Sequence, residues 1–217
     1  MSYFVSWSGG KDCCFACYKA ISEGCKVTQL LNLRFKGSSH RVDPSLLRFQ
    51  AECIGLSIVQ QDTLWENYEH DFKQTVRPLV SKDVRGIIFG DIFCKEFQEQ
   101  KHKAWAEKVS GELGVRAVEP LWGMTAERIF RDFIAAGFEA IIISVKSDLI
   151  DDGWLGCTLD EAFFDYLVRK KLNACGEMGE YHTLVVAGPL FKKKIYILES
   201  KHIKSGKYSQ LEILKYE

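Results

Sequence analysis

The chain has 217 residues, of which 47% are hydrophobic and 27% are charged, the composition of an ordinary packed globular protein. Its 29 basic side chains balance 29 acidic ones, so no overall field attracts a nucleic acid or an anionic membrane surface. No apolar stretch reaches the ~18 residues of a spanning helix, and the N-terminus lacks the pattern of a signal peptide. The eight scattered cysteines fit a reduced, cytoplasmic protein, and we expect neither a membrane nor a nucleic-acid partner.

Short apolar runs alternate with segments of helical period in the first half of the chain. The runs predict strands at residues 3–7, 27–33, 56–59, 87–89 and 115–118. The segments between them predict helices at 12–24, 44–55, 65–77 and 95–113, the second of them capped by Asp43 and ended by Gly55. Because parallel strands need long crossover connections, the alternation predicts an α/β fold with a parallel sheet.

The pattern changes after Pro120. A helix is expected at 125–136, a very apolar strand at 140–145, and a second helix from Thr158, which forms a capping box with Glu161. Strands at 183–187, 195–198 and 211–214 then follow without a helix between them, which predicts a smaller α+β unit. We therefore predict one domain at residues 1–121 and a second at 122–217.

A glycine-rich turn, Ser8-Gly9-Gly10-Lys11-Asp12, separates the first strand from the first helix. Such a turn lets backbone N–H groups and the positive helix end face a phosphate. It is not a P-loop, because Val5 stands where that motif needs glycine and Asp12 where it needs Ser or Thr. The purely structural alternative is a tight turn with Asp12 as an N-cap.

The spelling of this turn after an apolar strand resembles the PP-loop, S-G-G-x-D-S, of the N-type ATP pyrophosphatases, which split ATP into AMP and pyrophosphate through an adenylate. The resemblance implies that the loop lines the ATP phosphates with Ser8, Gly9, Gly10, Lys11, Asp12 and Cys13. Cys13 replaces the final serine of the motif, and a thiol is a weaker donor and a poor Mg²⁺ ligand. Nucleotide binding without turnover is therefore an alternative function.

The first helix carries three cysteines, Cys13, Cys14 and Cys17, with Cys13 and Cys17 one turn apart. Spacing alone allows a metal site. No second Cys or His pair stands nearby in sequence, and cysteine is common in a helix packed on a sheet, so core packing is the favoured interpretation.

A second motif, C-G-E-M-G-E-Y-H-T, occupies residues 175–183. It places Glu177, Glu180 and His182 just ahead of an apolar strand. The three side chains could be solvated charges of a strand-entry loop, metal ligands, or part of a functional site.

The order of motifs along the chain resembles the diphthine-ammonia ligase family of ATP pyrophosphatases. The resemblance rests on residues 5–12, Gly90-Asp91, the E-P-L-W run at 119–122, the second motif, and G-P-L-F at 188–191, and so covers essentially the whole chain. It implies an N-terminal ATP-binding domain of the adenine nucleotide α hydrolase (HUP-like) type and a family-specific C-terminal acceptor domain. The activity of the family converts a carboxylate of diphthine, a modified histidine on elongation factor two, into an amide with ATP and ammonia.

The resemblance also implies roles for individual residues. ATP and Mg²⁺ are the expected cofactors, with no metal ligand set assigned. Gly90 and Asp91 follow the fourth strand at the sheet edge that holds ligands in such folds, where Asp91 would meet Mg²⁺, ribose or the acceptor; Asn32 is a candidate for the adenosine edge. The expected catalytic residues are Lys11, Asp12, Glu177, Glu180 and His182.

The leading hypothesis is therefore an ATP-dependent amide ligase. Its expected partners are ATP, ammonia and a carboxylate acceptor, and a homo-oligomer is possible. An RNA-modifying adenylase is a second candidate, weakened by the zero net charge and by a basic run no longer than 192–194. A non-catalytic nucleotide sensor is the third, and it rests on Cys13.

Overall fold

The computed structural model describes residues 1–35, 42–93 and 101–217. The chain divides into two compact units. The first comprises Met1–Ser8, Asp12–Ser38 and Leu56–Gly123, and the second comprises Gly9–Lys11, Ser39–Gly55 and Met124–Glu217. Two segments from the first half of the sequence thus group with the second unit, and the boundary between residues 121 and 122 stays a prediction.

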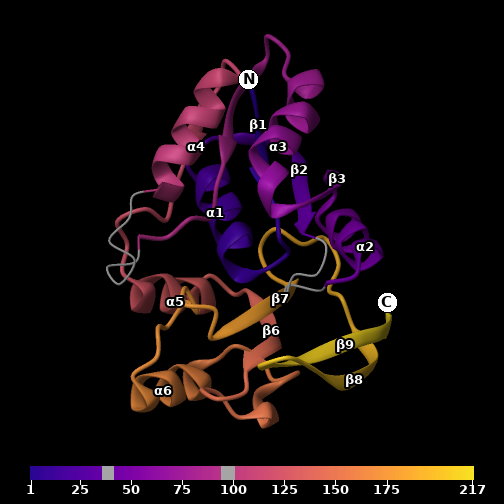
Figure 1. Ribbon diagram of the computed structural model, residues 1–217, viewed down its shortest axis with the longest axis vertical. Helices are drawn as coiled ribbons and strands as arrows, with labels where there is room; N and C mark the ends of the chain where they lie inside the picture. Colours follow the sequence, from indigo (N-terminus) through magenta and orange to yellow (C-terminus); the bar gives the residue numbers. More distant parts are fainter. Residues whose placement is uncertain (36–41, 94–100) are drawn as a thin grey trace. The chain divides into compact units, whose positions relative to one another are not determined.

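The secondary structure follows the alternation expected for the first half of the chain (Figure 1). The helices are α1 (Lys11–Ser22), α2 (Pro44–Ile54), α3 (Tyr68–Val76), α4 (Lys101–Glu112), α5 (Ala126–Ala135) and α6 (Glu161–Lys170), with short 3₁₀ helices η1 (Trp65–Asn67), η2 (Arg77–Leu79) and η4 (Asp152–Trp154). The strands are β1 (Ser2–Ser6), β2 (Lys26–Phe35), β3 (Ser57–Thr63), β4 (Val84–Ile88), β5 (Arg116–Val118), β6 (Glu139–Lys146), β7 (Tyr181–Ala187), β8 (Ile197–Ser205) and β9 (Tyr208–Tyr216).

The first unit is built on a five-stranded sheet in the order β3-β2-β1-β4-β5, and every pair of neighbours is parallel. The predicted α/β class is confirmed. Adjacent residues of β1 point to opposite faces, yet Phe4 and Val5 are both buried, so both faces of the sheet are covered. Because all five strands run the same way, their carboxyl ends meet at one edge.

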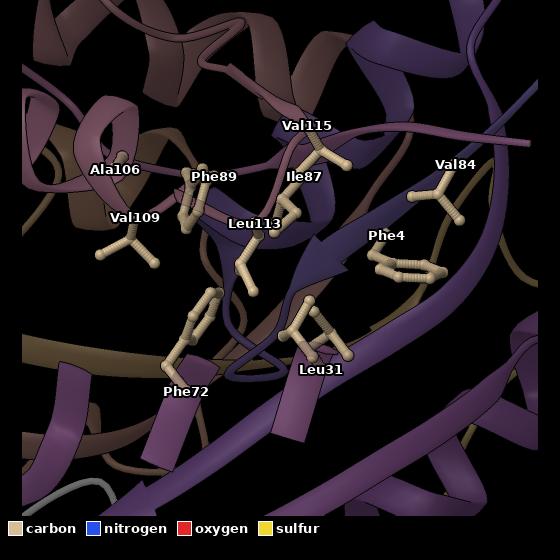
Figure 2. Packing of buried hydrophobic residues seen from close by; sticks show 11 residues of the cluster. Phe4, Leu31, Phe72, Val84, Ile87, Phe89, Ala106, Val109, Leu113 and Val115 are labelled. Atoms are coloured by element: carbon tan, nitrogen blue, oxygen red, sulfur yellow. The ribbon is translucent and has the colours of Figure 1, made fainter. Parts of the chain in front are cut away.

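One face of this sheet carries the main aromatic core, shown in Figure 2. Phe4, Leu31 and Ile87 from the strands meet Phe72 of α3 and Val109 of α4. The ring of Phe72 lies 5.4 Å from that of Trp105 and 6.1 Å from that of Phe89, in edge and tilted contacts that aromatic pairs favour.

Local capping signals explain where α2 begins and ends. The carboxylate of Asp43 accepts a hydrogen bond from the backbone N–H of Ser45 at 2.7 Å, and Pro44 occupies the first turn. Gly55 ends the helix in the left-handed conformation. The predicted start and stop are confirmed, although α2 groups with the second unit rather than the first.

The second unit contains an antiparallel sheet in the order β7-β6-β9-β8, together with α5 and α6. The predicted α+β character of this part is confirmed, but the unit is not the smaller of the two, because residues 9–11 and 39–55 also belong to it. Helix α2 belongs to this unit through its C-terminal half: the ring of Phe49 lies 5.3 Å from that of Tyr216, and Cys53 accepts a hydrogen bond from the N–H of Lys192.

The predicted capping box at Thr158 is wrong. Thr158 forms a β-bridge with Ile141, and the N–H of Leu159 donates to the carbonyl of Ala140, so the chain stays extended up to Asp160. Asp160 caps α6 instead, accepting from the N–H of Phe163 at 3.0 Å. Bonding to a neighbouring strand overrides the local signal at Thr158.

Two other helices differ from their predicted extents. The predicted helix 65–77 is split into η1, α3 and the start of η2, where Pro78 follows. The first residues of the predicted helix 95–113, residues 95–100, lie outside the described part of the chain. Among the described residues, no helix combines the length and apolar character needed to cross a membrane.

The fully buried ring of Phe72 predicts a large effect on stability. We expect Phe72→Ala to lower the free energy of unfolding by about 3–5 kcal/mol, because truncation leaves a cavity among the rings of Tyr68, Phe89 and Trp105. Trp65→Ala is the control: Trp65 is 75% exposed, and the loss should stay at ~1 kcal/mol, from its ring contact with Phe35. Urea denaturation of both variants measures the difference, and equal losses would contradict this view of the core.

Candidate active site

The glycine-rich loop needs a residue without a side chain at position 9. Gly9 has φ +80°, and a Cβ there would lie 2.5 Å from Cδ2 of Leu47 and 2.9 Å from Oε1 of Gln50. Both contacts are shorter than van der Waals packing allows. The left-handed backbone and the close approach of α2 therefore each require glycine.

A buried polar network holds the carbonyl side of this loop. The carbonyl of Gly9 accepts from the side-chain amide of Gln50 and from the N–H of Val185, both at 3.0 Å. The same Gln50 amide nitrogen also donates to the carbonyl of Val185 at 2.7 Å, and Gln50 is fully buried. Thr183 contributes a further bond, because its hydroxyl accepts from the N–H of Lys11 at 3.1 Å.

Lys11 belongs to the second unit, and its side chain is only 3% exposed. Its Nζ donates to the carbonyl of Cys175 at 2.5 Å and lies 5.4 Å above the ring centre of Tyr181. The two motifs recognised in the sequence are therefore in direct contact. The ammonium was expected at the ATP phosphates, and in the structure it contacts the carbonyl of Cys175 and the ring of Tyr181, both in the second motif.

Asp12 and Cys13 belong to the first unit, where the end of β4 approaches the first turn of α1. A Cβ on Gly90 would lie 2.8 Å from the backbone nitrogen of Cys13 and 2.9 Å from the carbonyl carbon of Asp12. Only glycine allows this approach. The backbone after β4 therefore packs directly against the backbone of the first turn of α1.

Cys13 sits in a polar contact despite its burial. Its Sγ lies 3.5 Å from the hydroxyl oxygen of Ser8. Burial raises the pKa of the Cys13 thiol, but hydrogen bonds from Cys14 and Ser8 outweigh burial and leave this pKa below its usual value. Burial raises the pKa of Cys17 to about 12. Cys13 is therefore the better nucleophile of the two.

Carboxylates gather at the carboxyl ends of neighbouring strands of the first unit. Asp91 follows β4, Glu119 follows β5, and Asp12 lies in the first turn of α1, which follows β1. Burial, and then the charge of Asp12, raise the pKa of Asp91, while His102, with Nδ1 at 4.0 Å, lowers it. Burial, and then the charge of Asp91, raise the pKa of Glu119 to about 7. A carboxyl of this kind exchanges a proton near neutral pH.

These carboxylates fit Mg²⁺ by their chemistry. The described residues contain no group of three or more His, Cys, Asp or Glu side chains that could enclose a metal. Mg²⁺ does not need such a group, because it is usually bound through one or two carboxylates together with substrate phosphates and water. Oε1 of Glu119 is a buried oxygen without a hydrogen-bond partner, which is consistent with a site that a cation would complete.

Asn32, the candidate for the adenosine edge, is buried near the end of β2. Its side-chain amide donates to the carbonyl of Trp7 at 2.7 Å, and its Oδ1 accepts from the side chain of Gln60 at 3.3 Å. These bonds connect β2 to Trp7, which directly follows β1, and to the middle of β3. They support a structural role for Asn32 in shaping the entry to the glycine-rich loop.

The second motif is anchored by Glu180. Its carboxylate accepts from the N–H of Met178 at 2.8 Å and from the N–H of Asn173 at 3.3 Å, and the residue is 3% exposed. These bonds support a scaffold role for Glu180. Glu177 and His182 are partly exposed, with the His182 ring 6.4 Å from that of Tyr208, and they remain the predicted contacts of an acceptor.

Sequence reasoning missed Gln50 and Thr183 as supports of the glycine-rich loop, and it gave Glu119 no role. Gln50 carried a usable signal: it lies on the apolar face of α2 that buries Leu46, Leu47, Ala51 and Ile54. A polar residue on a buried face must find partners there. The pattern could have marked Gln50 as part of a polar network, although not which backbone groups it meets.

The contrast between two buried thiols of α1 can be tested by labelling. We expect iodoacetamide at about pH 8 to modify Cys13 before Cys17, because only the pKa of Cys13 is lowered and the thiolate is the reactive form. Both thiols are buried, with 5% of Cys13 and 0% of Cys17 exposed. Peptide mass spectrometry over time measures the two rates, with Cys13→Ser as the assignment control. Faster labelling of Cys17 would show that hydrogen bonding does not control reactivity here.

The raised pKa of Glu119 predicts a pH dependence of stability. Between its usual 4.5 and about 7, this carboxyl holds a proton in the folded chain that it has lost in the unfolded chain. The corresponding stability is fully present below pH 4.5 and is lost as the pH rises through about 7. We expect Glu119→Gln to show a smaller loss of unfolding free energy than wild type on going from about pH 5 to about pH 8.

Urea denaturation without Mg²⁺ at the two pH values measures this difference. Glu52→Gln is the matched control, because Glu52 is an exposed glutamate on α2. The assignment is refuted if Glu119→Gln and wild type lose the same stability between the two pH values.

Comparisons with known proteins place the whole chain. The profile of the diphthamide synthase N-terminal domain matches residues 1–117, and that of the diphthamide synthase C-terminal domain matches residues 125–217. The Schizosaccharomyces pombe protein named diphthine–ammonia ligase is 27% identical over 95% of this chain, and the Rattus norvegicus protein of the same name is 29% identical over 90%. The chain spans 38% of the S. pombe relative and 82% of the rat relative.

A crystal structure described as a predicted subunit of tRNA methyltransferase from Methanocaldococcus jannaschii is 16% identical, with a TM-score of 0.46 over 89% of this chain and 99% of that one. A likeness of this size has no bearing on function. The two domain profiles match in order and leave only a short stretch between them, and the chain therefore belongs to the diphthamide synthase family.

Proposed function

We propose that this chain is an ATP-dependent ligase that forms a carbon–nitrogen bond, activating the carboxylate of diphthine with ATP and joining it to ammonia. The observation that carries the proposal is the glycine-rich loop at the carboxyl end of β1, whose carbonyl side is bonded to buried Gln50 and to Val185. A loop held in this way, with the N-terminus of α1 directly after it, suits a polyphosphate. Family membership supplies the class of reaction.

The chemistry proceeds in two displacements. The acceptor carboxylate attacks the α-phosphorus of ATP, the bond to the β-phosphate oxygen breaks, and pyrophosphate leaves. Ammonia then attacks the acyl carbon, AMP leaves, and one proton is released. Backbone N–H groups of the loop and the N-terminus of α1 stabilise the negative charge that builds on the leaving group.

Mg²⁺ would be held by Asp12 and Asp91 and would supply charge neutralisation on the phosphates. Glu177 and His182 would orient the acceptor, and Glu180 would keep their loop in shape through its bonds to Met178 and Asn173. The acceptor in this proposal is diphthine on elongation factor two. We place the protein in the cytoplasm, because none of the described cysteines forms a disulfide, as expected in a reducing compartment.

The products of ATP cleavage test this proposal. Full-length protein incubated with ATP, Mg²⁺, ammonium and a diphthine-bearing acceptor should release AMP and pyrophosphate in equal amounts, and omission of the acceptor should abolish release. ADP and phosphate as products would refute cleavage between the α and β phosphates. ATP binding without any turnover would favour the sensor, for which the specific observation is Cys13 in the place of a serine.

Asp12→Asn and Asp43→Asn provide matched variants, since each removes a charge from the first turn or the cap of a helix. We expect Asp12→Asn to reduce AMP formation by roughly a hundredfold or more, a typical loss when charge stabilisation of a transition state is removed. Asp43→Asn should retain activity, and neither variant should lose more than ~1 kcal/mol of stability. Equal activity of the two variants would place Asp12 outside the chemistry.

A further inference from the structure

The ammonium of Lys11 is placed where a charge is costly unless it is compensated. Lysine is almost never fully buried without a partner, yet Lys11 is 3% exposed. Its compensation includes the carbonyl of Cys175 at 2.5 Å and the face of Tyr181 at 5.4 Å. A carbonyl oxygen and an aromatic face are both favourable partners for a desolvated ammonium.

Both partners of this ammonium are themselves fixed in place. The N–H of Cys175 donates to the side chain of Asn173 at 2.8 Å, and the hydroxyl of Tyr181 donates to the carbonyl of Ala174 at 2.5 Å. The ring of Phe163 meets the Tyr181 ring edge-on at 5.0 Å. The partners therefore cannot follow a displaced Lys11 without breaking their own contacts.

The backbone of Lys11 is held by the same part of the chain. Its N–H donates to the hydroxyl of Thr183, and two residues earlier the carbonyl of Gly9 accepts from the N–H of Val185. Residues 9–11 are thus bonded to residues 175–185 through backbone, side chain and ring. All of these residues lie within the second unit.

We propose that Lys11 is a positioning residue that couples the glycine-rich loop to the second motif, so that nucleotide bound at the first loop orders residues 175–183, the acceptor side of the reaction. The inference rests on the proposed function in taking the glycine-rich loop as the ATP site and Glu177 and His182 as acceptor contacts. Lys11 then transmits the state of one loop to the other, and ATP and acceptor bind with positive cooperativity.

Hydrogen exchange measured by mass spectrometry tests the connection without any turnover. Lys11→Met keeps the length of the side chain and removes its charge. We expect exchange in residues 175–183 to rise by about tenfold or more in this variant, the effect of losing a buried hydrogen bond to a charged group. Lys19→Met is the matched control: Lys19 is on the same helix, and its Nζ lies 5.9 Å above the ring of Phe15 within that helix. Unchanged exchange at 175–183 in Lys11→Met would overturn the proposal.

The second part of the experiment repeats the exchange measurement with Mg-ATP. Mg-ATP should slow exchange at residues 8–13 and at 175–183 in wild type and in Lys19→Met, but only at 8–13 in Lys11→Met. Protection of 175–183 that persists in Lys11→Met would also overturn the coupling. If Mg-ATP protects neither segment in wild type, the proposed ATP site fails, and the nucleotide-free comparison still decides whether Lys11 holds the second motif.

Substitutions of Tyr181, the ring that the ammonium contacts, test the same coupling. They keep the proposal testable if Lys11→Met fails to fold. Tyr181→Phe keeps the aromatic face and should keep the protection of residues 175–183 by Mg-ATP, whereas Tyr181→Leu should lose it. Circular dichroism establishes that each variant is folded. If Mg-ATP no longer protects residues 175–183 in Tyr181→Phe but still protects them in Tyr181→Leu, the aromatic ring is not what holds the ammonium.

Discussion

The glycine-rich loop depends on what happens at the carbonyl of Gly9. A phosphate loop must turn its N–H groups toward the ligand, and its carbonyls then need partners on the opposite side. Here Gln50 and Val185 supply them. Neither is near the loop in sequence, so the first motif takes its shape from α2 and β7. Removing Gln50 would leave the buried carbonyl of Gly9 with only the N–H of Val185 among these donors, and would take the Gln50 donor from the carbonyl of Val185.

The parallel sheet of the first unit imposes the second constraint. Five strands that run the same way bring their carboxyl ends to one edge, and the residues that follow three of them include Asp12, Asp91 and Glu119. Like charges in this position raise the pKa of Asp91 and Glu119, after the larger effect of burial. The chain keeps a repulsive arrangement that folding alone does not require. A cation brought with the substrate would relieve it, which is the physical reason to connect this edge with Mg²⁺.

Much of this could be predicted from sequence because it depends on short-range signals. The strand, glycine turn and helix around residues 3–22, and the cap of α2 at Asp43 and Gly55, follow from periodicity and local backbone preference. The prediction of a capping box at Thr158 was wrong because a β-bridge to Ile141 competes with the capping signal. The orientations of the Lys11 and Glu180 side chains could not be predicted. The Lys11 side chain is held by a segment more than 160 residues away in the sequence. The Glu180 side chain turns back to accept a hydrogen bond from its own loop.

The direction of Lys11 changes how charge must be balanced around the nucleotide. With the ammonium bonded to Cys175, the phosphates in the proposed reaction rely on backbone N–H groups and on the cation held by Asp12 and Asp91. A nucleotide without its metal would meet those carboxylates directly and be repelled. Nucleotide and Mg²⁺ therefore act as a single ligand in this scheme, and the buried lysine is left to connect the two loops. The same division explains how a chain with no net charge can hold a polyanion: the positive charge arrives with the substrate.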